Sequence, residues 1–271
     1  DAVVQQDRQV QARTGKGEFQ MSIRVINFIK RAAAVLLFAP AVAFAAGASV
    51  HLDKAPVSTD PAALQHGAKL FVNYCLNCHS ASFVRYNQLE NIGLSEQLIR
   101  DNLLFAGEKT GDLMKIAMRP DESKVWFGKA PPDLTLVARA RASGDGSGAD
   151  WLYTYLRQFY RDTERPTGWN NVIFSNVGMP HVLWELQGEQ VAKVTQNADG
   201  TTTTTLELVK PGKLSPAEYD KAMADLVSFL VWMGEPVAEK RKSIGVVVLI
   251  FLAGLFVLSY ALKKNYWKDI H

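Results

Sequence analysis

The chain has 271 residues, 48% of them hydrophobic, and its 30 Lys and Arg against 27 Asp and Glu give a formal net charge of +3. That is enough for one domain with its own core plus additional segments. From residue 46 to residue 239 the balance is 23 acidic against 18 basic side chains. This excludes the basic surface that a nucleic-acid binder needs and suits a basic protein partner, although ordinary solubility charge explains it equally well.

Residues 21–45 have the three parts of a secretory signal: basic residues from 24 to 31, an apolar run from 32 to 44, and small residues near 45. The apolar run contains Pro40 and is too short for a hydrocarbon layer of roughly 30 Å. We therefore expect cleavage after Ala45 or Ala46 rather than an uncleaved anchor. Residues 1–20 are interpreted as upstream translated sequence, and the exported domain is expected over residues 46–239.

The first element of the exported domain is a helix that begins at Asp60-Pro61 and continues directly into Cys75. Asp suits a helix cap and Pro the first helical position, and Leu64, Ala68, Phe71 and Val72 recur at helical spacing.

The sequence at its end, Cys75-Leu76-Asn77-Cys78-His79, is a C-x-x-C-H motif, which is typical of covalent attachment of haem c. Two thiols on one turn can each form a thioether to the same porphyrin, and the next residue, His79, is then placed to ligate iron. A redox disulfide and half of a zinc site are the alternatives. Zinc would need two further ligands, and the chain has no other Cys.

The middle of the domain is rich in loops, with helices expected at 95–104 and 150–160 and a Gly-rich loop at 142–150. Within it lies the candidate sixth ligand of the iron, Met179, in a Gly- and Pro-containing loop that could bring a thioether to a buried iron. His181 remains its rival. The other methionines that we weighed are expected to fill the core, two on a patch with helical spacing and two on the last helix: Met114, Met118, Met223 and Met233.

After this loop, alternating patterns at 182–186, 190–195 and 201–209 predict strands, and Asp199-Gly200 is a turn signal, so we expect a small exposed hairpin. Ser215-Pro216-Ala217-Glu218 is a capping box that begins an amphipathic helix.

Residues 244–262 are an uninterrupted apolar run of about 29 Å in helical form, which predicts a transmembrane helix within a terminal segment over 240–271. The fold class expected is mainly α, a c-type cytochrome domain with long loops, a small β-hairpin and one C-terminal transmembrane helix.

Several blocks of the sequence resemble cytochrome c1, the haem subunit of quinol:cytochrome c oxidoreductase of the bacterial type. They are residues 74–80 followed by 85–89, residues 130–135 followed by 139–141, residues 177–180, and the single C-terminal anchor. The resemblance implies one covalently bound haem c and assigns roles to seven residues: thioethers at Cys75 and Cys78, His79 and Met179 on the iron, Arg141 near a haem propionate, and Pro131 and Pro132 lining the pocket.

The resemblance also implies the function and the partners. Single electrons would pass from a Rieske iron-sulfur protein to a cytochrome c acceptor, without bond-making chemistry in this subunit, and cytochrome b would contact the anchor in a dimeric complex. In a bacterial inner membrane the haem domain would be periplasmic and the C-terminus cytoplasmic. The alternatives are an anchored electron carrier outside any complex, a haem peroxidase and a thiol-disulfide oxidoreductase.

Overall fold

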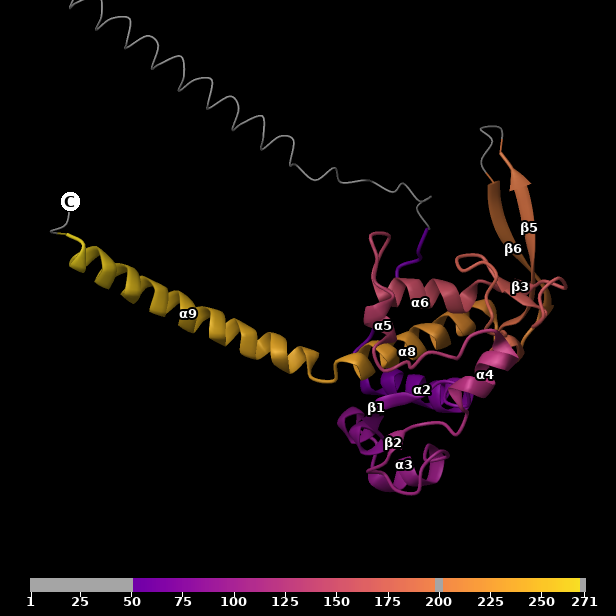
Figure 1. Ribbon diagram of the computed structural model, residues 1–271, viewed down its shortest axis with the longest axis horizontal. Helices are drawn as coiled ribbons and strands as arrows, with labels where there is room; N and C mark the ends of the chain where they lie inside the picture. Colours follow the sequence, from indigo (N-terminus) through magenta and orange to yellow (C-terminus); the bar gives the residue numbers. More distant parts are fainter. Residues whose placement is uncertain (1–50, 198–201, 269–271) are drawn as a thin grey trace, which may run out of the picture. The chain divides into compact units, whose positions relative to one another are not determined.

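The structure is a computed structural model that describes residues 51–197 and 202–268. Three helices form the centre of the domain, with α8 (Pro216–Gly234) lying between α2 (Pro61–Leu70) and α6 (Gly148–Arg157) (Figure 1). All three begin at side-chain caps. Asp60 accepts from the Ala63 amide, and Ser147 and Ser215 each form a reciprocal capping box. Such caps satisfy amide groups at the helix start that have no intrahelical partner.

The contact between α2 and α8 depends on a glycine. A Cβ atom at Gly67 would lie 2.2 Å from the backbone oxygen of Asp225 and 2.6 Å from the Cβ of Phe229. One turn later, the rings of Phe71 and Phe229 pack with centroids 5.6 Å apart. The absence of a side chain at Gly67 therefore lets the two backbones approach, and the interior of this contact is fully buried.

The segment that precedes α2 crosses α6 and α8. The amide of Asp53 donates to the Thr154 hydroxyl, that of Ala55 to the Asp150 carboxylate, and that of Ser58 to the Ser228 hydroxyl. Residues 53–58 thus connect α6 to α8 by donating backbone amides to buried side chains of these two helices.

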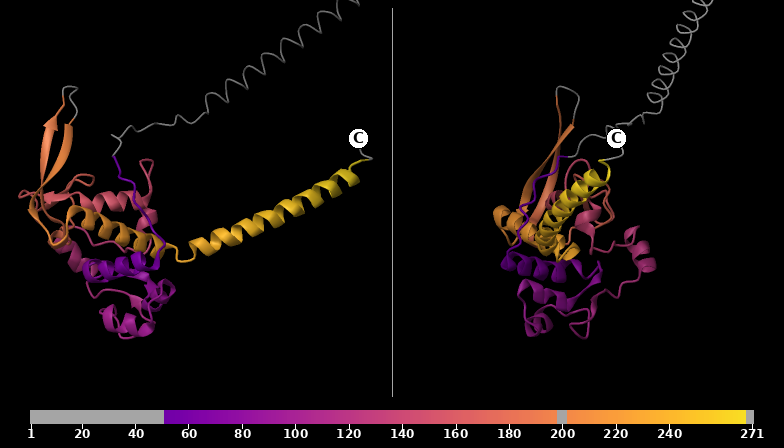
Figure 2. Two further views of the ribbon diagram at one scale, coloured as in Figure 1. Left: turned by 180° about the vertical axis from the view of Figure 1, so that it is seen from behind. Right: turned by 90° about the vertical axis from the view of Figure 1, so that its left-hand side faces the viewer.

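The other elements are short and surround this centre (Figures 1 and 2). The helices are the π-helical turn η1 (Phe71–Cys75), the 3-10 helix η2 (Tyr86–Ile92), α3 (Glu96–Asn102), α4 (Pro120–Phe127), α5 (Val137–Ala140) and α7 (Trp184–Gln187). The strands form three antiparallel pairs: β1 (Ala81–Arg85) with β2 (Leu113–Met114), β3 (Phe159–Arg161) with β4 (Trp169–Asn171), and β5 (Gly188–Gln196) with β6 (Thr202–Pro211).

The predicted hairpin is confirmed as β5 and β6, with register Gly188↔Pro211 at its base and Gln196↔Thr202 near its tip. It projects from the domain in all views, and its threonines are largely exposed (Figures 1 and 2). Asp199-Gly200 lies outside the described residues. Two apolar side chains of the hairpin, Val194 and Leu208, are also exposed.

Four local predictions were wrong. Residues 182–186 form no strand, because a turn there leads into α7. The second helical patch ends at Arg157, and Tyr160 lies in β3. The Gly-rich loop ends at residue 147, where Ser147 caps α6. Met114 belongs to the short strand β2 rather than to a helix, since its segment pairs with β1.

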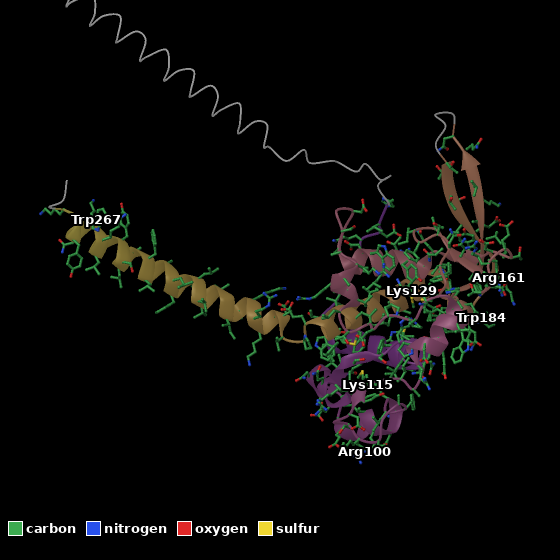
Figure 3. All side chains as sticks on the ribbon, viewed as in Figure 1. Arg100, Lys115, Lys129, Arg161, Trp184 and Trp267 are labelled. Carbon is green, nitrogen blue, oxygen red and sulfur yellow. The ribbon has the colours of Figure 1, made fainter. Side chains whose placement is uncertain are left out.

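The C-terminal helix α9 (Ala238–Tyr266) contains the whole predicted apolar run and extends beyond it at both ends. It is the only helix of the described residues that is long and apolar enough to cross a membrane. Its side chains are exposed along its length, and Trp267 lies directly after its last turn (Figure 3). Covering such an apolar helix with a lipid phase is favourable, because it removes the exposed apolar side chains from water. The fold class is confirmed: a mainly α domain with small hairpins and one C-terminal apolar helix.

Candidate haem site

The C-x-x-C-H motif begins at the last residue of η1, where the helix becomes a turn. The Cys78 and His79 amides both donate to the Cys75 carbonyl, at 3.1 and 2.9 Å, so both thiols and the imidazole belong to one turn. The two thiols are not joined by a disulfide. Burial, and to a lesser extent the neighbouring Cys78, raises the pKa of Cys75 to about 12. A thiol-disulfide oxidoreductase needs the opposite, an easily formed thiolate.

The imidazole of His79 is oriented by a backbone group. Its Nδ1 lies 2.7 Å from the carbonyl oxygen of Pro132. Because a carbonyl only accepts, Nδ1 carries the proton and donates, which leaves the lone pair of Nε2 available for a metal. Burial lowers the pKa of His79 despite the opposing effect of the Pro132 carbonyl, which favours the neutral ring. A neutral imidazole is the form that ligates iron.

Pro132 is held in place by the residues that follow it. Leu134 donates its amide to the Ser80 carbonyl at 2.9 Å, and the Asp133 carboxylate accepts from the Ser82 and Thr135 amides at 2.7 and 2.9 Å. The Pro131-Pro132 block and the C-x-x-C-H motif, about fifty residues apart in the chain, are therefore adjacent. Pro132 is exposed and contributes its carbonyl, and Pro131 is partly buried.

Met179 lies in the irregular segment between β4 and α7 and packs, partly buried, against the core. Its sulfur lies 3.4 Å from the hydroxyl oxygen of Tyr155 on α6. The preceding Gly178 passes close to the end of α4, because a Cβ there would lie 2.8 Å from the Phe127 oxygen. The segment that carries Met179 is thus confined between α4 and α6. The Met179 sulfur lies in largely apolar surroundings.

The rival ligand His181 is part of an aromatic cluster. It is 2% exposed, its ring lies parallel to Phe159 at 4.8 Å, and the edge of Trp169 meets it at 5.0 Å. Burial lowers its pKa to about 4. A buried Nε2 without a hydrogen-bond partner among the described residues would suit a ligand as well, so the core role rests on the enclosure of the ring by Phe159 and Trp169. Met114, Met223 and Met233 are also buried in the core, as expected.

Arg141 follows the short helix α5. Its guanidinium lies 4.3 Å above the ring of Trp151 and 5.6 Å from that of Phe174. Within residues 51–197 and 202–268 it makes no ion pair with a carboxylate. Stacking of this kind holds a guanidinium in one orientation and leaves its N–H groups free for an acid, such as a propionate.

The sequence alone did not reveal three residues around Met179. Tyr155 donates to the sulfur, and two buried asparagines fix the start of the loop. Asn171 donates to the Tyr155 carbonyl at 2.8 Å, and the Asn170 side-chain oxygen accepts from the Asn176 amide at 2.9 Å. The only sequence signal was an Asn pair eight residues before Met179, which also fits an ordinary turn.

The donor groups fit a haem of the c type: two unbridged thiols on one turn, an imidazole whose Nε2 is free, a thioether and an unpaired guanidinium. No group of three or more His, Cys, Asp or Glu side chains that could hold a metal ion occurs among the described residues. Fold and site together define a membrane-anchored c-type cytochrome.

Comparison with known proteins identifies the family of c-type cytochromes to which the chain belongs. The sequence profile of the Cytochrome C1 family matches residues 51–270, and the chain belongs to this family. It is 48% identical over 244 residues to cytochrome c1 of Allochromatium vinosum, with 88% of this chain and 98% of the relative covered. The mitochondrial cytochrome c1 haem protein of Saccharomyces cerevisiae is 25% identical over 235 residues, covering 78% of this chain and 68% of that protein.

A protein of Nitrosomonas europaea named ammonia monooxygenase gamma subunit is 51% identical over 250 residues, covering 92% of this chain and all of that protein. The name ammonia monooxygenase gamma subunit describes that relative and is not carried over to this chain. As a member of the cytochrome c1 family, the chain carries one covalently bound haem c and transfers electrons as the haem subunit of a quinol:cytochrome c oxidoreductase, which also contains cytochrome b and a Rieske protein. Membership does not support the peroxidase and the carrier outside a complex.

Proposed function

We propose that Cys75 and Cys78 form the two thioethers, that His79 Nε2 and the Met179 sulfur are the axial iron ligands, and that Arg141 binds a propionate. The observation that carries this assignment is the 2.7 Å contact between His79 Nδ1 and the Pro132 carbonyl, because it fixes the tautomer that a proximal histidine requires. Bound haem supplies a one-electron iron couple. With His79 and Met179 as ligands in both oxidation states, the structural change during electron transfer would be small.

Pro131 and Pro132 are proposed to line the haem pocket. Between them they supply a rigid, extended segment, and the Pro132 carbonyl is already engaged with His79. In this arrangement the same block covers the haem and orients its proximal ligand. Residues 80–83 and 133–135 keep the block in place through the hydrogen bonds described above.

The electron acceptor is proposed to be a cytochrome c that docks on the haem domain. The mild acidity of residues 46–239 supports a basic partner. The test is a turnover assay of the purified membrane complex with a quinol and a soluble basic cytochrome c. We expect rapid reduction of the cytochrome c that slows as ionic strength rises, because salt screens attraction between opposite charges. No reduction, with the complex intact, would exclude this acceptor class.

The haem domain over residues 46–239 is proposed to be periplasmic in a bacterium, residues 240–271 to form the anchor with its short cytoplasmic end, and the complex to be a dimer. The signal-like residues 21–45 support export of everything before the anchor. Alkaline phosphatase fused after His271 should stay inactive, because that enzyme needs export, whereas the same fusion after Lys240 should be active. The opposite pattern would reverse the orientation. The mass of the purified complex tests the dimer.

A further inference from the structure

The hydroxyl of Tyr155 makes a hydrogen bond to a sulfur atom, which is an uncommon use of a buried tyrosine. The oxygen lies 3.4 Å from the Met179 Sδ, and Tyr155 is only 8% exposed. A hydroxyl has one proton to donate, and a thioether sulfur only accepts. The proton of Tyr155 therefore lies on the side of the sulfur.

The ring that carries this hydroxyl cannot change its direction easily. It stacks on Trp151 with centroids 4.7 Å apart and an interplanar angle of 14°, and Phe159 meets it edge-on at 5.0 Å and 70°. Phe174 contacts it from a third direction at 6.4 Å. Because rings packed in this way keep one rotamer, the position of the hydroxyl is set by the core rather than by the sulfur.

The backbone of Tyr155 also fixes the loop that carries Met179. Its carbonyl accepts from the Asn171 side-chain amide at 2.8 Å, and the Asn171 oxygen accepts from the Ile173 and Phe174 amides at 3.2 and 3.3 Å. The beginning of the loop is therefore hydrogen-bonded to the Tyr155 backbone carbonyl, and Met179, near its end, to the Tyr155 hydroxyl. One residue of α6 holds it at two points.

We propose that Tyr155 is a positioning residue for the distal ligand, which orients the Met179 thioether towards the haem iron and raises the reduction potential through its hydrogen bond to the sulfur. This rests on the assignment of Met179 as a ligand. Thioether sulfur has two lone pairs, of which the hydrogen bond occupies one and leaves the other for iron. The bond withdraws electron density from the ligand, so it disfavours the oxidised, more positive iron relative to the reduced one.

The test compares Tyr155→Phe with Tyr153→Phe in the purified holoprotein. Both changes remove one hydroxyl from a buried tyrosine of α6, but Tyr153 faces Arg157, whose guanidinium lies 4.3 Å from its ring. Tyr155→Phe should lower the reduction potential and so shift the equilibrium between reduced and oxidised iron about 2- to 10-fold towards the oxidised form, as expected for loss of one neutral hydrogen bond. Tyr153→Phe should leave the potential at its wild-type value.

Tyr155→Phe keeps the ring and its packing, so the holoprotein should form, and its thermal unfolding checks this. The inference fails if Tyr155→Phe matches the wild type in reduction potential, while Met179→Leu abolishes the near-infrared sulfur-to-iron band. If Met179→Leu keeps that band, the ligand assignment itself fails, and the role of Tyr155 fails with it. The two results are distinguishable because the band reports the ligand, and the potential of Tyr155→Phe reports the hydrogen bond.

Discussion

The Nδ1 atom of His79 lies 2.7 Å from the carbonyl oxygen of Pro132. The imidazole of the C-x-x-C-H motif and the Pro-Pro block therefore form one unit, although 53 residues separate them in the chain. Hydrogen bonds to a ligand histidine set its tautomer and raise its basicity, and their loss weakens metal binding. In the proposed site, backbone groups would thus orient the proximal ligand, and side chains of α6 and the Met179 loop would orient the distal one.

The first prediction concerns the distal ligand. Met179→Leu should lower the reduction potential and abolish the weak near-infrared band, since loss of a thioether removes the ligand that favours reduced iron. Met118→Leu is the matched control, because Met118 is also partly buried. Redox titration and near-infrared spectroscopy measure both effects. A band that disappears in Met118→Leu and persists in Met179→Leu would reassign the ligand.

The second prediction concerns Arg141. Arg141→Gln should lower the potential and reduce the amount of haem incorporated, because a cation near a propionate stabilises its carboxylate and disfavours positive charge on iron. Arg100→Gln on α3 is the control, since Arg100 is exposed and pairs only with Glu96. The ratio of haem to polypeptide and the midpoint potential test this. Unchanged values in Arg141→Gln would make it a stacked structural residue.

The third prediction is a pH dependence of stability. Burial tends to raise the pKa of Asp150, but hydrogen bonds from the Ala55 and Ser147 amides and from Lys54 lower it to about 2. A depressed folded-state pKa contributes stability above the unfolded value near 4, and this contribution is lost as pH falls from 4 towards 2. At pH 7, Asp150→Asn should therefore lower the free energy of unfolding by about 1–2 kcal/mol.

The control for this prediction is Asp145→Asn, because Asp145 is exposed in the loop before α6. Its unfolding free energy should stay within about 0.5 kcal/mol of the wild type. The difference between Asp150→Asn and the wild type should shrink as the pH approaches 2. An equal difference at pH 7 and pH 2 would contradict the electrostatic account.

The fourth prediction concerns the contact between α2 and α8. Gly67→Ala should destabilise the domain by about 1–3 kcal/mol or more, because the new Cβ would meet the Asp225 oxygen at 2.2 Å and force the helices apart. Gly144→Ala adds the same group where nothing lies within 4 Å and should be close to neutral. Thermal unfolding of the two holoproteins gives the comparison. Equal melting temperatures of the Gly67→Ala and Gly144→Ala proteins would show that the contact between α2 and α8 has room for a methyl group.

The sequence predicted the elements whose signals are local. The capped helices, the hairpin β5–β6 and the C-terminal helix all followed from patterns within one segment, and so did the C-x-x-C-H motif. It missed the pairs β1–β2 and β3–β4, in which three of the four strands are only two or three residues long. It also read 182–186 as a strand, since an apolar run that short suits a strand or a buried turn equally.

The sequence indicated candidate residues for the site, but not which side chains they contact. The sequence left Met179 and His181 open, because a loop pattern says nothing about which side chain enters the core. The structure packs the His181 ring between Phe159 and Trp169, and brings the Met179 sulfur to Tyr155. Asn170 and Asn171 could not have been singled out, since an Asn pair also fits an ordinary turn and the hydrogen bond from Asn171 to the Tyr155 carbonyl depends on the fold.

The central claim is that one haem is bound covalently through Cys75 and Cys78. Extraction of the purified protein with acidified acetone tests it most directly, because thioether bonds survive this treatment and ligation alone does not. We expect the pigment to stay with the polypeptide, and to be released completely or never incorporated when Cys75 and Cys78 are both replaced by Ser. A wild-type protein that loses all of its pigment to the solvent would contradict the account.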